Sequence, residues 1–248
     1  MLLRRMTENL RTQNWLAVAL DFLIVVLGVF LGVQLGNWND ASQDNRSERA
    51  VLLQLHEEIV SAQSIFDDSR VYDPDVLPNI QTFVNAFYHG EGELTEELIC
   101  TAAGVSTVMP NVIGKLSSVE ELIATGRLSR LSDPELRQAI GDFHEMTTIN
   151  ETRIVDYRTV AVSLQKEFSE HFSLIPYIDE SDGEVRLGGE CDAAAMREDQ
   201  VFRNTLARNL DIYDSWYRRF VLQPKDSLER LHHDTDKALG LSHEGDAG

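Results

Sequence analysis

The most distinctive hydrophobic pattern lies near the N-terminus, where an apolar run of 22 residues begins at Trp15 and contains only Asp21 and Gln34 as strongly polar members. A helix of this length covers about 33 Å, enough for a hydrocarbon core of about 30 Å. Trp15 and Trp38 stand at the two ends, where indole rings favour the membrane–water interface. The pattern predicts a transmembrane helix over 15–37, with both tryptophans as interfacial anchors.

Glycines recur four residues apart within this run, in the stretch VVLGVFLGVQLG. Small residues at this spacing let two membrane helices approach closely, and an acid within a span usually faces protein or water. We therefore expect a helix–helix interface, either between copies of the chain or with another membrane protein. Its residues are Asp21, Val25, Gly28, Gly32 and Gly36. The alternative is that glycine is simply common in membrane helices and that the aspartate side chain reaches toward the membrane surface.

Charge on either side of the run indicates its orientation. Residues 1–14 carry three arginines against one glutamate, a net charge of +2, whereas the whole chain carries −19. Because basic residues stay on the cytoplasmic side, we expect 1–14 in the cytoplasm and everything after residue 37 outside it.

A cleaved signal peptide is the main competing interpretation of the run. A cut after Ala41 would place Asn39 at the −3 position, where small residues are preferred. This match is poor, so an uncleaved signal anchor is favoured. A buried helix of a soluble protein is the remaining alternative.

Beyond residue 37, apolar positions recur at spacings of three and four, which is typical of helices. The first helix is expected to continue without a break past Phe66 and to be ended by Pro74 and Pro78. A short helix is expected over 95–103.

Local capping signals define the next helices. Ser117 followed by Glu120 fits a capping box, and Gly126 stands where a C-terminal glycine belongs. Asp133 followed by Pro134 predicts the start of another helix.

The helix that starts at Pro134 is expected to be long, because its apolar stripe continues to Phe168 and no proline follows until Pro176. Residues 178–192 are predicted to form a loop or a small hairpin. Two further helices are then expected, with the last one opening at Pro224. The ranges are 201–220 for the first and 225–239 for the second.

These elements together predict an all-α protein. We expect a single N-terminal transmembrane helix, then an acidic, extracytoplasmic, antiparallel helical bundle over 38–239. Residues 240–248 are predicted to be a disordered tail.

The strong negative charge excludes a basic surface for nucleic acid, so no nucleic-acid partner is expected. Cys100 and Cys191 are the only cysteines. In an exported domain they could form one disulfide, and the sequence leaves open whether they do.

Candidate chemistry is sparse. The densest potential ligand group is His232, His233, Asp234 and Asp236, but adjacent helical residues point about 100° apart. Glu229 with His232 gives one Glu-x-x-His pair, whereas a di-iron bundle needs two such pairs. No nucleophile elbow, phosphate loop or dinucleotide fingerprint occurs in the sequence. We therefore predict no cofactor, no metal site and no enzymatic activity.

Two stretches, GVQLGNWND and SSVEELIATGRLSRLSDPELRQAIGDF, give the chain a family likeness. It resembles a family of uncharacterised bacterial single-pass membrane proteins whose N-terminal span ends in an N-W-N motif. The resemblance implies the bacterial inner membrane, with the N-terminus cytoplasmic and the main domain periplasmic, and it supplies no activity. The expected role is a structural or accessory subunit that acts by association. An extracytoplasmic ligand-binding or sensory module working through a separate partner is the alternative.

Overall fold

The computed structural model describes residues 15–69, 71–110, 112, 114–181 and 183–241, and the side chains of 15–21, 36, 37 and 39–41 lie outside the description. The chain divides into two compact units, Met1–Val51 and Leu52–Gly248. The predicted cytoplasmic segment 1–14 and most of the predicted tail 240–248 lie outside the described residues.

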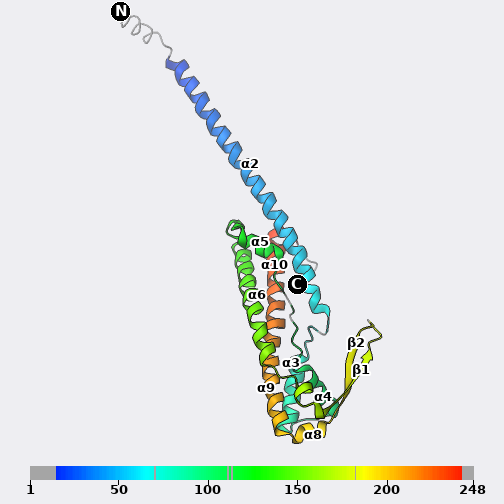
Figure 1. Cartoon of the computed structure of the whole chain (residues 1–248). Helices are drawn as coiled ribbons and strands as arrows, with labels where there is room; N and C mark the ends of the chain where they lie inside the picture. The colour runs from blue at the N-terminus through cyan, green and yellow to red at the C-terminus, as the bar shows by residue number, and fades with distance from the viewer. Residues whose placement is uncertain (1–14, 70, 111, 113, 182, 242–248) are drawn as a thin grey trace, which may run out of the picture. The chain divides into compact units, whose positions relative to one another are not determined.

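Helices account for most of the described chain, which confirms the predicted helical class (Figure 1). The helical elements are α2 (Trp15–Gln63), η1 (Ser64–Asp67), α3 (Val76–Val84), η2 (Asn85–His89), α4 (Glu96–Val105), α5 (Ser117–Ala124), η3 (Arg127–Arg130), α6 (Pro134–Val160), α7 (Leu164–Glu167), η4 (Ser169–His171), α8 (Ala193–Glu198), α9 (Gln200–Tyr217), η5 (Arg218–Leu222) and α10 (Gln223–Leu239). The strands are β1 (Phe172–Ile178) and β2 (Val185–Cys191), which form an antiparallel hairpin.

The first unit contains the N-terminal part of α2, a helix of 49 residues that runs without a break, as predicted. Every described side chain from Phe22 to Leu35 is exposed. Among the residues that the structure describes, no helix is both long enough and apolar enough to cross a membrane. The helix over 15–37 is thus confirmed, and its crossing of a membrane stays a prediction.

In the second unit, α6 and α10 pack side by side in antiparallel directions (Figure 1). Both helices bury residues at the three- and four-residue spacing that makes one apolar stripe. The buried members are Leu136, Ala139, Ile140, Phe143, Met146, Thr147, Asn150 and Ile154 on α6 and Leu228, Leu231, Thr235, Asp236 and Leu239 on α10. Lys237 forms an ion pair with Glu135 in the first turn of α6.

A second apolar cluster joins the short helices at the other end of this unit. Phe83 of α3, Ile99 of α4 and Phe202 of α9 are among its fully buried members. Cys100 of α4 is bonded to Cys191 at the end of β2, across 91 residues of chain. The disulfide therefore attaches the hairpin to the short-helix cluster. The sequence left open whether these two cysteines are bonded, and in the structure they are.

The predicted long helix from Pro134 toward Pro176 is wrong beyond residue 160. α6 ends at Val160, and Ala161 is extended. The Asn209 side chain accepts a hydrogen bond from Val162 N–H at 3.1 Å and donates one to Val162 C=O at 2.7 Å. Because these two backbone groups are satisfied by α9, they do not continue the helix.

A small hairpin was one of the two predictions for residues 178–192, and the structure contains it. Its first strand, β1, begins before that range, at Phe172. Pro176 lies within β1, paired with Leu187. A two-stranded hairpin leaves outward-facing edge positions, where a residue without an N–H is tolerated.

The predicted capping box at Ser117 is also wrong. Ser117 is the first helical residue of α5, and no side chain of its own segment caps it. Instead, Glu58 of α2 accepts hydrogen bonds from Ser118 N–H at 3.0 Å and from Ser118 Oγ at 2.9 Å. Glu120 pairs with His144 Nδ1 at 2.8 Å. A carboxylate from a distant helix thus satisfies one of the free amides of the first turn.

The other local signals are confirmed. Asp133 accepts hydrogen bonds from two amides at the start of α6, and Gly126 adopts the left-handed conformation after α5. The short helix expected over 95–103 is α4, and the structure adds that Thr95 caps it. Pro224 opens α10, as predicted, but directly after a π-helical turn, η5. A proline ring clashes with the carbonyl four residues earlier in a regular α-helix, and the wider turn relieves that clash.

The end of the first helix is earlier than predicted. α2 passes into the 3₁₀ turn η1 at Ser64, well before Pro74, and Pro78 lies inside the first turn of α3. A proline is tolerated there because the first helical amides have no partner within the helix.

Candidate functional site

The predicted helix–helix interface lies in the first unit, and the structure describes three of its five residues. A Cβ atom added at Gly28 or Gly32 would meet no atom within 4 Å, and Val25 is exposed. The side chains of Asp21 and of the anchor Trp15, together with the surroundings of Gly36, lie outside the description. The other anchor, Trp38, is 75% exposed. The interface therefore stays a prediction.

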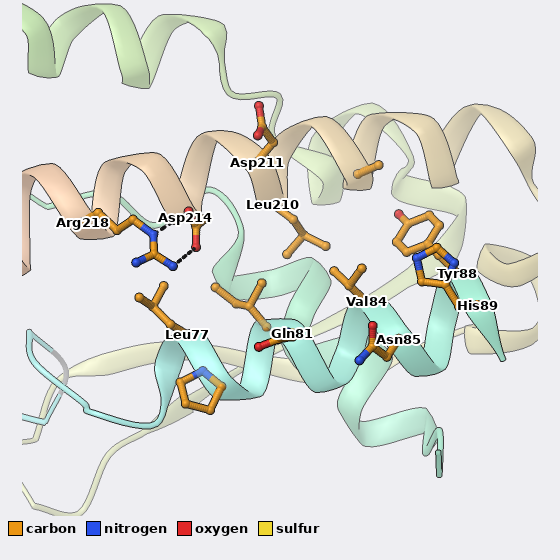
Figure 2. Close-up of a pocket in the computed structure, with 13 residues that line it drawn as sticks. Leu77, Gln81, Val84, Asn85, Tyr88, His89, Leu210, Asp211, Asp214 and Arg218 are labelled. Atoms are coloured by element: carbon orange, nitrogen blue, oxygen red, sulfur yellow. Dashed lines mark hydrogen bonds and ion pairs between the residues drawn. The ribbon is translucent and has the colours of Figure 1, made fainter. Parts of the chain in front are cut away.

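A groove runs along the second unit between α3 with η2 on one side and α9 with η5 on the other (Figure 2). Its volume is about 940 Å³. Asp214 and Arg218 are joined at one end by hydrogen bonds of 2.9 and 3.2 Å, and this pairing raises the pKa of Arg218. Tyr88 and His89 lie at the other end. Apolar side chains such as Leu77 line the space between.

Tyr88 is held at its end of the groove by backbone. Its hydroxyl donates a hydrogen bond of 2.8 Å to the carbonyl of Arg203. Burial raises the pKa of Tyr88 to about 12, and the neighbouring Arg203 charge opposes this shift in part. The phenol therefore keeps its proton throughout the physiological pH range.

A second cavity, of about 490 Å³, lies between α3, α4 and α9. Its wall is mainly apolar and aromatic, and it shares Ile80 and Leu210 with the groove. Phe83, Tyr213, Trp216 and Tyr217 supply the aromatic surface. A concave apolar site with a few polar groups is the usual form of a small-molecule site.

The polar atoms of this cavity differ in their hydrogen bonding. Tyr217 Oη donates to Asp73 C=O at 2.6 Å and accepts from Asp73 N–H at 3.0 Å, so that hydroxyl is fully used. Burial raises the pKa of Tyr213 to about 12. Trp216 is 2% exposed, and its buried Nε1–H has no hydrogen-bond partner among the described residues. A buried donor without a partner costs stability, and Trp216 is one of the residues that line the cavity.

The potential ligand residues that the sequence places together on α10 do not all lie on one face of that helix. His232 and Asp236 lie one turn apart on the same face, whereas His233 is exposed. His56 of α2 completes a group of three potential ligands with His232 and Asp236, and all three belong to the second unit. Sequence reasoning missed His56 because the two segments lie far apart along the chain. The sequence places His56 beside Leu55 on the apolar stripe of its helix, which indicates a position near the core but does not connect it with α10.

Comparison with protein-family models, curated proteins and solved structures finds no significant match to this chain. The resemblance to single-pass membrane proteins therefore stays a prediction.

Proposed function

We propose that this protein is a non-catalytic accessory subunit anchored in the bacterial inner membrane by the apolar part of α2, with its helical domain on the periplasmic side. The supporting observation is the exposure of every described side chain from Phe22 to Leu35. Nine of these are large aliphatic residues, and two are phenylalanines. A helix that is apolar on all sides is stable only where something covers it.

The length of the segment bears on the proposal. The described part, 22–35, covers roughly 21 Å as a helix, less than the hydrocarbon core of about 30 Å. The proposal therefore depends on the sequence that flanks it, from Trp15 to Gly36, which is apolar except at Asp21 and Gln34.

The disulfide supports an exported domain. Disulfides persist in oxidising compartments such as the periplasm and are rare in the cytosol. The Cys100–Cys191 bond lies in the second unit, which follows α2's apolar part along the chain. This order agrees with the topology expected from the arginines before residue 15.

Alkaline carbonate extraction of bacterial membranes followed by flotation tests the anchor. We expect the full chain to stay with the membranes and the double variant Val26→Asp, Phe30→Asp to be released, because two charges oppose insertion. The matched control is Gln43→Asp, Asn45→Asp, which adds the same charge to an exposed polar part of α2. Release of the unmodified chain would contradict the proposal.

The finer part of the proposal is association through the glycine stripe. Gly32→Cys should form a disulfide-linked dimer in native membranes, or a crosslink to a second protein. Phe30→Cys, about 160° away around the helix, is the control and should crosslink much less. Equal crosslinking at both positions would contradict association through the glycine stripe, while the proposal of a membrane anchor would stand.

A second candidate function, ligand binding, is favoured by the cavity that contains Trp216. Its ligand would be an apolar molecule with one uncharged hydrogen-bond acceptor, and the side chains that cover the buried indole N–H would have to shift for the two to meet. A medium-chain methyl ketone is a suitable probe, read by thermal shift of the purified full chain. Trp216→Phe keeps most of the aromatic ring surface and removes the donor, so it should weaken binding, whereas Trp38→Phe should not. The absence of a shift with the unmodified chain would rule out this ligand class.

A further inference from the structure

Three side chains from two distant segments meet inside the second unit. His56 Nε2 lies 3.2 Å from Asp236 Oδ1, and His232 Nε2 lies 3.3 Å from Asp236 Oδ2. One ligand atom from each residue falls within 4.8 Å of the other two. The two imidazole rings are tilted at 55° with centroids 5.0 Å apart, so they converge without stacking face to face.

The local structure holds these side chains in place. His232 and Asp236 are four residues apart on α10 and therefore project from the same face. Leu231 and Thr235, which lie beside them on that helix, are fully buried. On α2, Leu55 and Ile59 on either side of His56 are also fully buried. Packing thus fixes both helices close to the three ligand atoms.

The burial of Asp236 points to a cation. Its side chain is only 6% exposed, while those of His56 and His232 are 23% and 20% exposed. A carboxylate removed from water is costly unless it is paired with positive charge or bound to a metal. The partly exposed imidazoles leave a path from solvent to the group.

We propose that His56, His232 and Asp236 form a zinc-binding site. Tetrahedral zinc with bonds of about 2.0–2.1 Å places its ligand atoms roughly 3.3–3.4 Å apart, close to the two measured separations. Two imidazoles and a carboxylate are a ligand set that zinc accepts, with the fourth position open to water or to an outside ligand. The ion would join α2 to α10 and stabilise the second unit, since it binds the folded chain.

The test is zinc titration of the purified full chain after treatment with a chelator. We expect one equivalent to bind, a rise in melting temperature with added zinc, and the visible spectrum of tetrahedral cobalt when Co²⁺ replaces zinc. His232→Asn and His56→Asn should each weaken binding by about tenfold or more and abolish the cobalt spectrum. His233→Asn is the matched control, because His233 is the exposed neighbour, and it should bind as the unmodified chain does.

Circular dichroism of each variant separates loss of the ligand from loss of the fold. If His232→Asn unfolds, the cobalt spectrum of the folded unmodified chain still decides the proposal. The proposal is overturned if the unmodified chain binds no stoichiometric zinc. It is equally overturned if binding is lost in His233→Asn and kept in His232→Asn, or if bound cobalt is octahedral, as at exposed surface histidines.

Discussion

Two helical segments of this molecule show opposite relations between hydrophobicity and burial. In α10 the apolar residues follow the helical repeat, and Leu228, Leu231 and Leu239 are buried against the rest of the second unit. Between Phe22 and Leu35 of α2 almost every residue is apolar, and all are exposed. The protein's own core covers the apolar stripe of an amphipathic helix. A helix that is apolar on all sides needs a cover from outside its unit.

The difference has an energetic consequence. Burying a leucine- or phenylalanine-sized side chain contributes about 1.5–3 kcal/mol relative to leaving it exposed. The core of the second unit already receives this contribution, and the α2 segment would receive it only where something covers it. We therefore expect equivalent substitutions in the two regions to have unequal effects on the stability of the second unit.

The largest expected effect comes from Phe143→Ala in α6, where the side chain is fully buried. The lost contacts and the resulting cavity should lower the free energy of unfolding by about 3–5 kcal/mol, measured by chemical denaturation. Phe30→Ala in α2 removes the same atoms from an exposed position and should leave that free energy nearly unchanged. Equal losses from both variants would show that α2's apolar segment belongs to the folded core.

Removal of the disulfide should have the next largest effect. Cys100→Ser, Cys191→Ser frees a segment that the bond closes across 91 residues, which should cost about 2–5 kcal/mol. The same change should leave membrane retention intact, since the bond lies outside the anchoring unit. Unchanged unfolding of the reduced, unmodified chain would count against a stabilising role for the bond.

Asn209 provides a smaller and more local test. This fully buried amide satisfies both backbone groups of Val162, so Asn209→Ala would leave them without partners. Because Val162 is only partly buried, water can replace part of the lost pairing, so the change should cost about 1–3 kcal/mol in total, and hydrogen exchange around 160–164 should rise. Asn204→Ala on the exposed face of α9 is the control and should cost far less. Unchanged stability together with unchanged exchange at 160–164 in Asn209→Ala would contradict this explanation of where α6 ends.

The smallest expected effect appears at alkaline pH. Burial raises the pKa of Tyr88 to about 12, above the ordinary value of 10.0. The unfolded chain releases this proton first, so the contribution of Tyr88 to stability is complete below pH 10 and decreases as the pH rises toward 12. In an alkaline titration followed by tyrosinate absorbance, Tyr88→Phe should show one fewer late-titrating group, meaning a tyrosine that ionises well above the ordinary pKa. In denaturant the unmodified chain should show no late-titrating group, and a late phase that persists there would contradict burial as the cause.

The sequence was most informative where residues close along the chain decide the structure. Gly126 and the Asp133–Pro134 pair mark helix ends through contacts with their own neighbours, and both were identified correctly. The errors arise where a distant group intervenes. Glu58 caps α5 from 60 residues away, and Asn209 ends α6 from the middle of another helix. Neither contact leaves a periodic trace in the sequence.

The candidate sites follow the same division. The apolar segment of α2 was evident from hydrophobicity alone, while the cavity lined by Trp216 and the group around Asp236 depend on how helices meet. A prediction from spacing on α10 compared His232 with its neighbours His233 and Asp234. It could not include His56, because nothing local links that residue to α10.

We propose that lipid covers α2 between Phe22 and Leu35, and a nitroxide label at Val29→Cys can show whether it does. The label, with Asn45→Cys as the matched control, is studied in membranes with oxygen and a water-soluble nickel chelate as relaxing agents. We predict that the Val29 label is relaxed mainly by oxygen, which concentrates in lipid, and the Asn45 label mainly by the chelate. A Val29 label relaxed by the chelate as strongly as the Asn45 label, or shielded from both agents, would contradict the claim.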